Sequence, residues 1–278
     1  MQQLTGCVAA CSFKHTSPAG AAIAIKFDQL SKYSQTILQT LYGLNESSSD
    51  AVNAYIRARN ADPQSSFGDF IGISTIVDEE LATVIKKYVS DGIVAPGYTD
   101  AALSILKEKK KGNYVIIQMT TTMTTDTLFK DCEFREMAGF AVSQPVNLMQ
   151  VTEQDLVSEK IVTKNNTDIG IVAKRDIIVA NACLKFAQSN NVACVTEGQL
   201  IGLSAGQQSR VHSVRLACHK AAVWITRHIT FSKDNVLQLK SDKNIHFQDI
   251  INQTTREAEF QTTKQFDGSN DYQIVLAR

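Results

Sequence analysis

The chain has 278 residues, of which 44% are hydrophobic, and its 28 basic side chains balance its 28 acidic ones. This is the composition of a globular protein with one large or two modest domains. A net charge of zero excludes a global electrostatic attraction to nucleic acid or to an acidic membrane. Anionic ligands would therefore need local clusters of positively charged side chains. We find no apolar run long enough for a membrane span and no signal-peptide pattern. The scattered cysteines, none in a Cys-x-x-Cys pair, indicate reduced, mostly buried thiols and a cytosolic protein.

Short apolar strands alternate with amphipathic helices over residues 1–119, the first predicted unit. The strands are predicted at 8–13, 70–76, 93–95 and 114–119, and the helices at 28–41, 49–59, 78–89 and 99–111. A turn is predicted over 17–20, where proline and glycine follow the first strand.

Residues 120–165 are threonine-rich and irregular, which predicts a connecting segment. A second α/β portion is predicted over 166–240, with helices at 174–188 and 209–228 and strands at 192–195 and 199–203. On the last helix, apolar residues recur every three or four positions and predict one buried stripe: Val211, Val214, Cys218, Ala221 and Ile225. Residues 241–278 are polar and receive no assignment. The alternation predicts an α/β layered fold around a mainly central sheet.

Lys14 and His15 stand side by side where the first predicted strand ends. The lysine ammonium disfavours a second positive charge on the imidazole, which keeps it neutral and able to remove a proton from an amine. The ammonium itself can stabilise an oxyanion developing on a carbonyl. A bare Lys-His pair is more often an exposed lysine beside a hydrogen-bonded histidine. A catalytic role for this pair is therefore favoured only by the surrounding sequence, SFKHTSPAGAA (12–22).

The segment GLSAGQQSRVH (202–212) predicts a turn that binds anions. Its glycines allow close backbone approach, Ser209 can cap the following helix, and Arg210 lies beside the free N–H groups of the helix start. An ordinary strand-to-helix turn needs the same residue types. Asn190 is predicted to bond its own backbone in a turn, although it could also orient a substrate amide.

Metal binding is not predicted, because the five histidines form no His-Glu-x-x-His or His-x-Glu pattern and no cysteine pair accompanies them. A zinc deaminase is therefore disfavoured.

Segments 12–22 and 202–212 together closely resemble the formyltransferase part of the AICAR transformylase/IMP cyclohydrolase family. The stretches ARNAD (58–62), SSFGDF (65–70) and VSDGIVAPGY (89–98) also match family motifs in order, as do 112–114, 162–165 and 175–180. The resemblance covers about residues 11–228. It implies a three-layer α/β/α fold of the cytidine-deaminase type without zinc.

The resemblance implies transfer of a formyl group from 10-formyltetrahydrofolate, as cosubstrate, to the 5-amino group of AICAR, a step of purine (IMP) biosynthesis. His15 matches the family's proton acceptor and Lys14 its transition-state stabiliser. Val211 matches a residue of the family that contacts the folate. The residues that match nucleotide contacts are Gly68, Asp91, Asn190 and Arg210. The family works as an intertwined homodimer, so the expected partners are AICAR, folate and a second copy, with no nucleic acid and no membrane.

The resemblance also implies what this chain lacks. We expect no IMP cyclohydrolase domain before the first strand, and after residue 240 nothing resembles the family's second lobe, so IMP cyclohydrolase activity is not supported. Two hypotheses follow: an AICAR formyltransferase polypeptide, or a truncated, catalytically incomplete relative that only binds nucleotide or dimerises with a full-length partner. Loss of a covering lobe exposes apolar area, which predicts poor solubility as a monomer.

Overall fold

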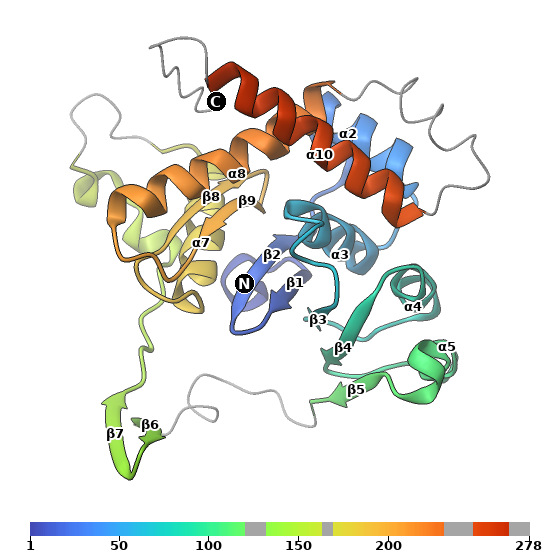
Figure 1. Cartoon of the computed structure of the whole chain (residues 1–278), viewed down its shortest axis with the longest axis horizontal. Helices are drawn as coiled ribbons and strands as arrows, with labels where there is room; N and C mark the ends of the chain where they lie inside the picture. The colour runs from blue at the N-terminus through green and yellow to red at the C-terminus, as the bar shows by residue number, and fades with distance from the viewer. Residues whose placement is uncertain (120–131, 163–168, 231–246, 267–278) are drawn as a thin grey trace.

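The computed structural model describes residues 1–119, 132–162, 169–230 and 247–266. Its main feature is a seven-stranded sheet of order β5-β4-β3-β1-β2-β9-β8 (Figure 1). The strands are β1 (Ala9–Lys14), β2 (Ser17–Ile23), β3 (Asp69–Ile73), β4 (Ser90–Ala95), β5 (Val115–Gln118), β8 (Val192–Thr196) and β9 (Gln199–Ser204). β3, β4 and β5 run parallel to one another, and the other pairings are antiparallel. Because β2 pairs with β9, strands from both predicted α/β portions share one sheet.

Helices flank this sheet, which confirms the predicted layered α/β class. They are α1 (Gln2–Thr5), α2 (Lys32–Ile37), α3 (Asp50–Ala61), α4 (Glu79–Lys86), α5 (Asp100–Lys107), α7 (Ile171–Lys185), α8 (Arg210–Thr230) and α10 (Phe247–Phe266). Short helical turns occupy Phe27–Gln29, Leu38–Tyr42, Lys109–Gly112, Glu153–Asp155 and Ser158–Lys160. Side chains of Ser49, Asp78 and Thr99 cap α3, α4 and α5 by accepting backbone N–H groups. The chain therefore starts these helices where its polar residues predict.

α3 is the central helix of the core and lies directly against β1, β2 and β9. Gly20 of β2 permits this approach, because a Cβ atom there would lie 1.9 Å from the carbonyl oxygen of Ala58. The glycine in the SPAGAA segment is thus required by helix-to-sheet packing. Gly202 of β9 has the same role against α8, where its Cβ would lie 2.3 Å from the carbonyl oxygen of Ala217.

Substituting Gly20 by alanine should lower the free energy of unfolding by about 1–3 kcal/mol, because backbone must move to admit the methyl group. Gly170, the residue before α7, has no atom within 4 Å of a built Cβ and serves as the matched control. Urea denaturation measures both variants. Equal stability of the two would contradict a close contact between α3 and β2.

Three sequence expectations need correction, and one region that received no assignment contains a helix. Residues 17–23 form strand β2, whereas a turn was expected over 17–20, and the actual turn is His15–Thr16. Val211 and Val214 are exposed, so the buried stripe of α8 runs instead through Ser213, Ala217, Ala221, Trp224 and His228. Within the segment 120–165, a hairpin forms from β6 (Cys132–Met137) and β7 (Phe140–Pro145). The polar region after 240 contains the helix α10, which packs along α8 (Figure 1).

A buried polar cluster joins α8 to the end of α3. Arg227 donates to Asn60 Oδ1 at 2.7 Å, and His228 Nε2 lies 3.3 Å from Asn60 Nδ2. His228 Nδ1 lies 2.7 Å from the carbonyl oxygen of Trp224, which can only accept. Nδ1 therefore carries the hydrogen, and Nε2 accepts from the Asn60 amide. Burial, together with the nearby Arg227 charge, holds the pKa of His228 well below its usual value.

This lowered pKa makes stability depend on pH. An unfolded histidine has a pKa near 6.5, so below that pH the unfolded state binds a proton that the folded state excludes. The stabilisation is complete above about pH 6.5 and is lost as the pH falls, by up to about 1.4 kcal/mol per unit. Thermal unfolding between pH 7 and 5.5 should show this slope, and the His228→Gln variant should lose it. An unchanged slope in that variant would refute the assignment.

Across the residues that the structure describes, no helix combines the length and the apolar character needed to cross a lipid bilayer.

Candidate functional site

The topology of the sheet brings the predicted site residues to one edge. β1 ends at Lys14 where β2 begins, and β3 and β4 also begin at this edge, which places Gly68 and Asp91 there. β9 runs antiparallel to β2 and therefore ends at the same edge, followed by the turn to Arg210. Val192 pairs with Ser204, so Asn190 lies just before β8 at this edge as well.

Lys14 forms the first of two polar groups at this edge. Its Nζ donates to the carbonyl oxygens of Phe67 at 2.7 Å and Gly68 at 3.3 Å. An ammonium has three hydrogens, so these bonds leave one for a ligand. Gly68 adopts a φ of +71°, and a Cβ on it would lie 3.2 Å from Lys14 Nζ and 4.0 Å from Asp91 Oδ1. Lys14, Gly68 and Asp91 are thus neighbours, as the resemblance implied.

Asp91 is itself paired with Lys110 at 2.5 Å, and both side chains are exposed. Solvent screens such a pair, so a ligand can compete for either partner. The adjacent Lys109 is more enclosed and donates to the carbonyl oxygens of Ile85 and Tyr88. Burial, with the Arg59 charge nearby, lowers the pKa of Lys109 to about 8.

His15 occupies the two-residue turn between β1 and β2 and is exposed. Its φ of +54° is uncommon for a residue with a side chain and costs on the order of 1 kcal/mol or more. The turn reverses the chain directly after Lys14, so that Ser17 pairs with Lys14. A histidine at a position that suits glycine is a backbone outlier of the kind that clusters at functional sites.

A buried network lies beneath the Phe67–Gly68 turn, and the sequence did not reveal it. Arg59 of α3 forms an ion pair with Asp69 at 2.9 Å and also donates to the carbonyl oxygens of Ser66 and Val89. Ser12 of β1 bonds both to Asp69 Oδ2 at 2.6 Å and to Ser66 Oγ at 2.8 Å. The guanidinium of Arg59 also stacks over the ring of Tyr88, 4.7 Å from its centroid.

Asn190 belongs to the second polar group. Its side-chain nitrogen donates to the carbonyl oxygens of Gln207 at 2.9 Å and Gln208 at 3.3 Å, so the side chain holds the glycine-containing turn. The sequence predicts that Asn190 bonds its own backbone, but its side-chain partners lie 17 and 18 positions away. The Ser213 hydroxyl donates to the Asn190 carbonyl and ties the first turn of α8 to the same loop.

Arg210 and Val211 open α8 with exposed side chains. The first turn of a helix leaves N–H groups without intrahelical partners and favours negative charge nearby. Among the described residues, no hydrogen bond or ion pair joins the Asn190–Arg210 group to the Lys14–Gly68–Asp91 group. What they share is the sheet edge.

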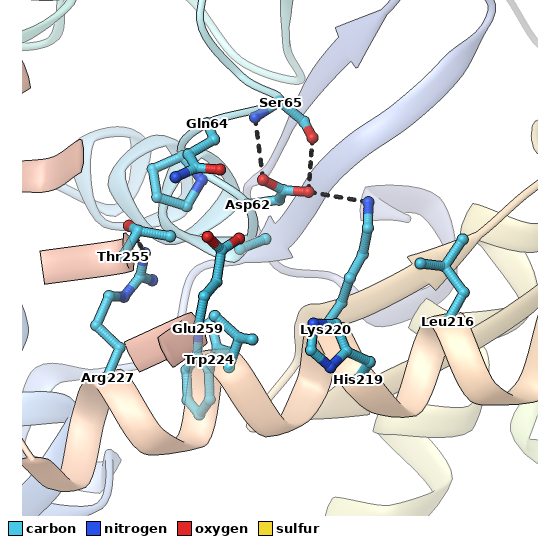
Figure 2. Close-up of a pocket in the computed structure, with 13 residues that line it drawn as sticks. Asp62, Gln64, Ser65, Leu216, His219, Lys220, Trp224, Arg227, Thr255 and Glu259 are labelled. Atoms are coloured by element: carbon cyan, nitrogen blue, oxygen red, sulfur yellow. Dashed lines mark hydrogen bonds and ion pairs between the residues drawn. The ribbon is translucent and has the colours of Figure 1, made fainter. Parts of the chain in front are cut away.

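A hollow of about 270 Å³ lies elsewhere, between the end of α3, α8 and α10 (Figure 2). Asp62 faces Lys220 across it at 3.0 Å and accepts the Ser65 hydroxyl at 2.7 Å. Burial alone would raise the pKa of Asp62, but Lys220 and the Ser65 hydrogen bonds lower it below its usual value. None of the residues predicted for the site lines this hollow.

No described group of three or more histidine, cysteine, aspartate or glutamate side chains is arranged to hold a metal ion.

Comparison with known families gives a match to the AICARFT/IMPCHase bienzyme model over residues 1–220. The matched stretch includes both polar groups at the sheet edge, from Lys14 to Val211. It spans most of the chain and indicates an enzyme family of purine biosynthesis. The protein therefore belongs to the AICARFT/IMPCHase bienzyme family.

Proposed function

We propose that the chain transfers a formyl group from 10-formyltetrahydrofolate to the 5-amino group of AICAR, giving FAICAR and tetrahydrofolate in the cytosol. One observation carries this proposal. The Lys14 ammonium is held by two carbonyls with one hydrogen to spare, at the sheet edge that also carries His15 and the Asn190–Arg210 turn. Family membership supports the same reaction class.

The chemistry is an acyl transfer in two stages. The 5-amino nitrogen attacks the formyl carbon while His15 removes a proton from the amine. Negative charge develops on the formyl oxygen, where the remaining Lys14 hydrogen stabilises it. The tetrahedral intermediate then collapses, the bond from carbon to N10 of the folate breaks, and N10 takes up a proton. No metal is needed for this sequence.

The substrates are assigned to the two groups at the edge. Gly68 and Asp91 contact the nucleotide on the Lys14 side, and Asn190 and Arg210 contact it on the other. The two hydrogens of the Asn190 amide already bond within the protein, which leaves its carbonyl oxygen for the ligand. Val211 is 57% exposed and offers an apolar surface to the folate.

The direct experiment incubates the purified chain with AICAR and 10-formyltetrahydrofolate and follows FAICAR by chromatography. Calorimetric titrations with AICAR and with a folate analogue run in parallel. Turnover together with binding of both ligands supports the proposal. Absence of turnover at saturating concentrations of both would refute it.

A second function has one observation in its favour. The β6–β7 hairpin exposes apolar side chains that usually lie in an interface: Phe134, Met137, Phe140 and Val142. They fit a chain that dimerises, with itself or with a full-length partner, and that binds nucleotide without completing catalysis. Calorimetry separates the two functions, because this one predicts AICAR binding without folate binding. Size-exclusion chromatography of the purified chain should give a dimer rather than a monomer.

A further inference from the structure

We propose that Ser12, Arg59 and Asp69 form a positioning network that fixes the Lys14 ammonium for catalysis. The inference rests on the proposed function, since it assigns a role to residues that act through Lys14. The three side chains touch no substrate position. They lie beneath the turn whose carbonyls hold the ammonium.

The direction of each hydrogen bond follows from the chemistry of the partners. A carboxylate only accepts, so Ser12 donates its single hydroxyl hydrogen to Asp69 Oδ2 at 2.6 Å. The contact between Ser12 and Ser66 at 2.8 Å must then be donated by Ser66. Arg59 Nη1 donates both to Asp69 Oδ1 and to the carbonyl oxygen of Ser66. The backbone and side chain of Ser66 are both fixed, directly before Phe67.

Gly68 is held by the same network. Its N–H donates to the carbonyl oxygen of Val89 at 3.0 Å, and Arg59 Nη2 donates to that same oxygen at 3.2 Å. The turn from Ser66 to Gly68 is therefore anchored at both ends by groups bonded to Arg59. Lys14 donates to the Phe67 carbonyl, which lies between these anchors, and to the Gly68 carbonyl, which directly follows the second.

A lysine side chain needs such acceptors, because its long flexible stem loses rotamer entropy when it is fixed. Displacement of a reacting group by about 1 Å can cost about 10²-fold in rate. Fold stability alone does not require such a network, because apolar residues of similar size often stabilise a fold as well as a buried ion pair does. Ser66 and Asp69 are fully buried, so the bonds that join them to Ser12 and Arg59 form away from solvent.

The test is a double-mutant cycle between Ser12→Ala and Lys14→Ala, read by formyl transfer. Ser12→Ala should lower kcat about 10- to 100-fold and leave the KM for AICAR within about twofold. In the Lys14→Ala background it should have no further effect on kcat. Ser66→Ala, which keeps the bond from Ser12 to Asp69, should give a smaller loss. Ser65→Ala is the matched control, because the Ser65 hydroxyl bonds Asp62 and not the network.

A second readout does not depend on turnover. Labelling by acetic anhydride, followed by mass spectrometry, reports how freely the Lys14 amine reacts, with exposed Lys26 as internal reference. Lys14 labelling should rise several-fold in Ser12→Ala and stay at the wild-type value in Ser65→Ala. Unchanged labelling in Ser12→Ala, or equal kcat losses in both backgrounds of the cycle, would overturn the positioning role. Full turnover by Lys14→Ala alone would instead remove the proposed role of Lys14, and labelling would still decide whether the network holds it.

Discussion

Formyl transfer by the Lys14→Ala variant should fall by about 10²- to 10³-fold in kcat, because in the proposed mechanism the ammonium donates to the developing oxyanion. His15→Ala should lose about 10²- to 10⁴-fold, as expected for removal of a general base. Steady-state kinetics at saturating AICAR and folate measures both. Lys26→Ala, an exposed lysine after the far end of β2, is the control and should keep wild-type kcat.

Folding of the His15 variants needs its own control. At a φ of +54°, glycine fits the turn better than alanine does, so His15→Gly should be more stable than His15→Ala by about 1 kcal/mol. Both variants should be equally inactive. Equal turnover in the wild type and in the Lys14 and His15 alanine variants would end the assignment of these roles.

Removal of one member of the buried ion pair should give the largest loss of stability. Arg59→Met leaves the Asp69 carboxylate buried without its cation, which costs about 3–5 kcal/mol. Lys86→Met breaks a surface pair with Glu108 in which both side chains are about half exposed, and it should cost less than about 1 kcal/mol. Urea denaturation at pH 7 compares the two.

A double variant, Arg59→Met with Asp69→Leu, sharpens this prediction. With both charges removed, most of the lost stability should return, since apolar side chains can replace a buried pair. Turnover should stay low, because the Ser66–Gly68 turn has lost its anchors. Full recovery of both stability and kcat would show that the pair serves folding alone.

Sequence patterns predicted most of the sheet strands and most helices, because these follow local rules, but they missed β2, β6 and β7. The strand at 8–13 and the helix at 49–59 lie within a residue or two of β1 and α3, and Ser49 caps α3 as its type favours. The expected turn at 17–20 failed for a tertiary reason. Pro18 and Gly20 were interpreted as turn residues, but Gly20 is a glycine because α3 packs against β2 at that point.

The other differences have similar causes. α10 is polar along most of its length and buries a few apolar side chains, such as Ile251 and Ala258, by packing along α8. Val211 and Val214 continue the helical apolar spacing, yet both are exposed while Ser213 between them is buried, so they lie on the outer face of α8. In the Arg59 network, Ser12 is 54 positions from Ser66 and 57 from Asp69, and Arg59 is 7 and 10 positions from the same two residues. No local pattern can indicate such a network.

For the site, the family resemblance assigned Lys14, Gly68 and Asp91 to one site, and in the structure Lys14 Nζ lies 3.3 Å from the Gly68 carbonyl oxygen. The sequence placed Asn190 between a helix and a strand and Arg210 at a helix start, without indicating that both lie at the edge where β1 ends. The order of strands in the sheet supplies that relation.

Whether one nucleotide bridges the two polar groups is the most direct test of the account. AICAR titrated into ¹⁵N-labelled protein should shift the backbone amides of Gly68, Asp91, Asn190 and Arg210 along a single binding curve with one Kd. Shifts confined to one group, or two groups that saturate with different Kd values, would contradict a shared site at this edge of the sheet.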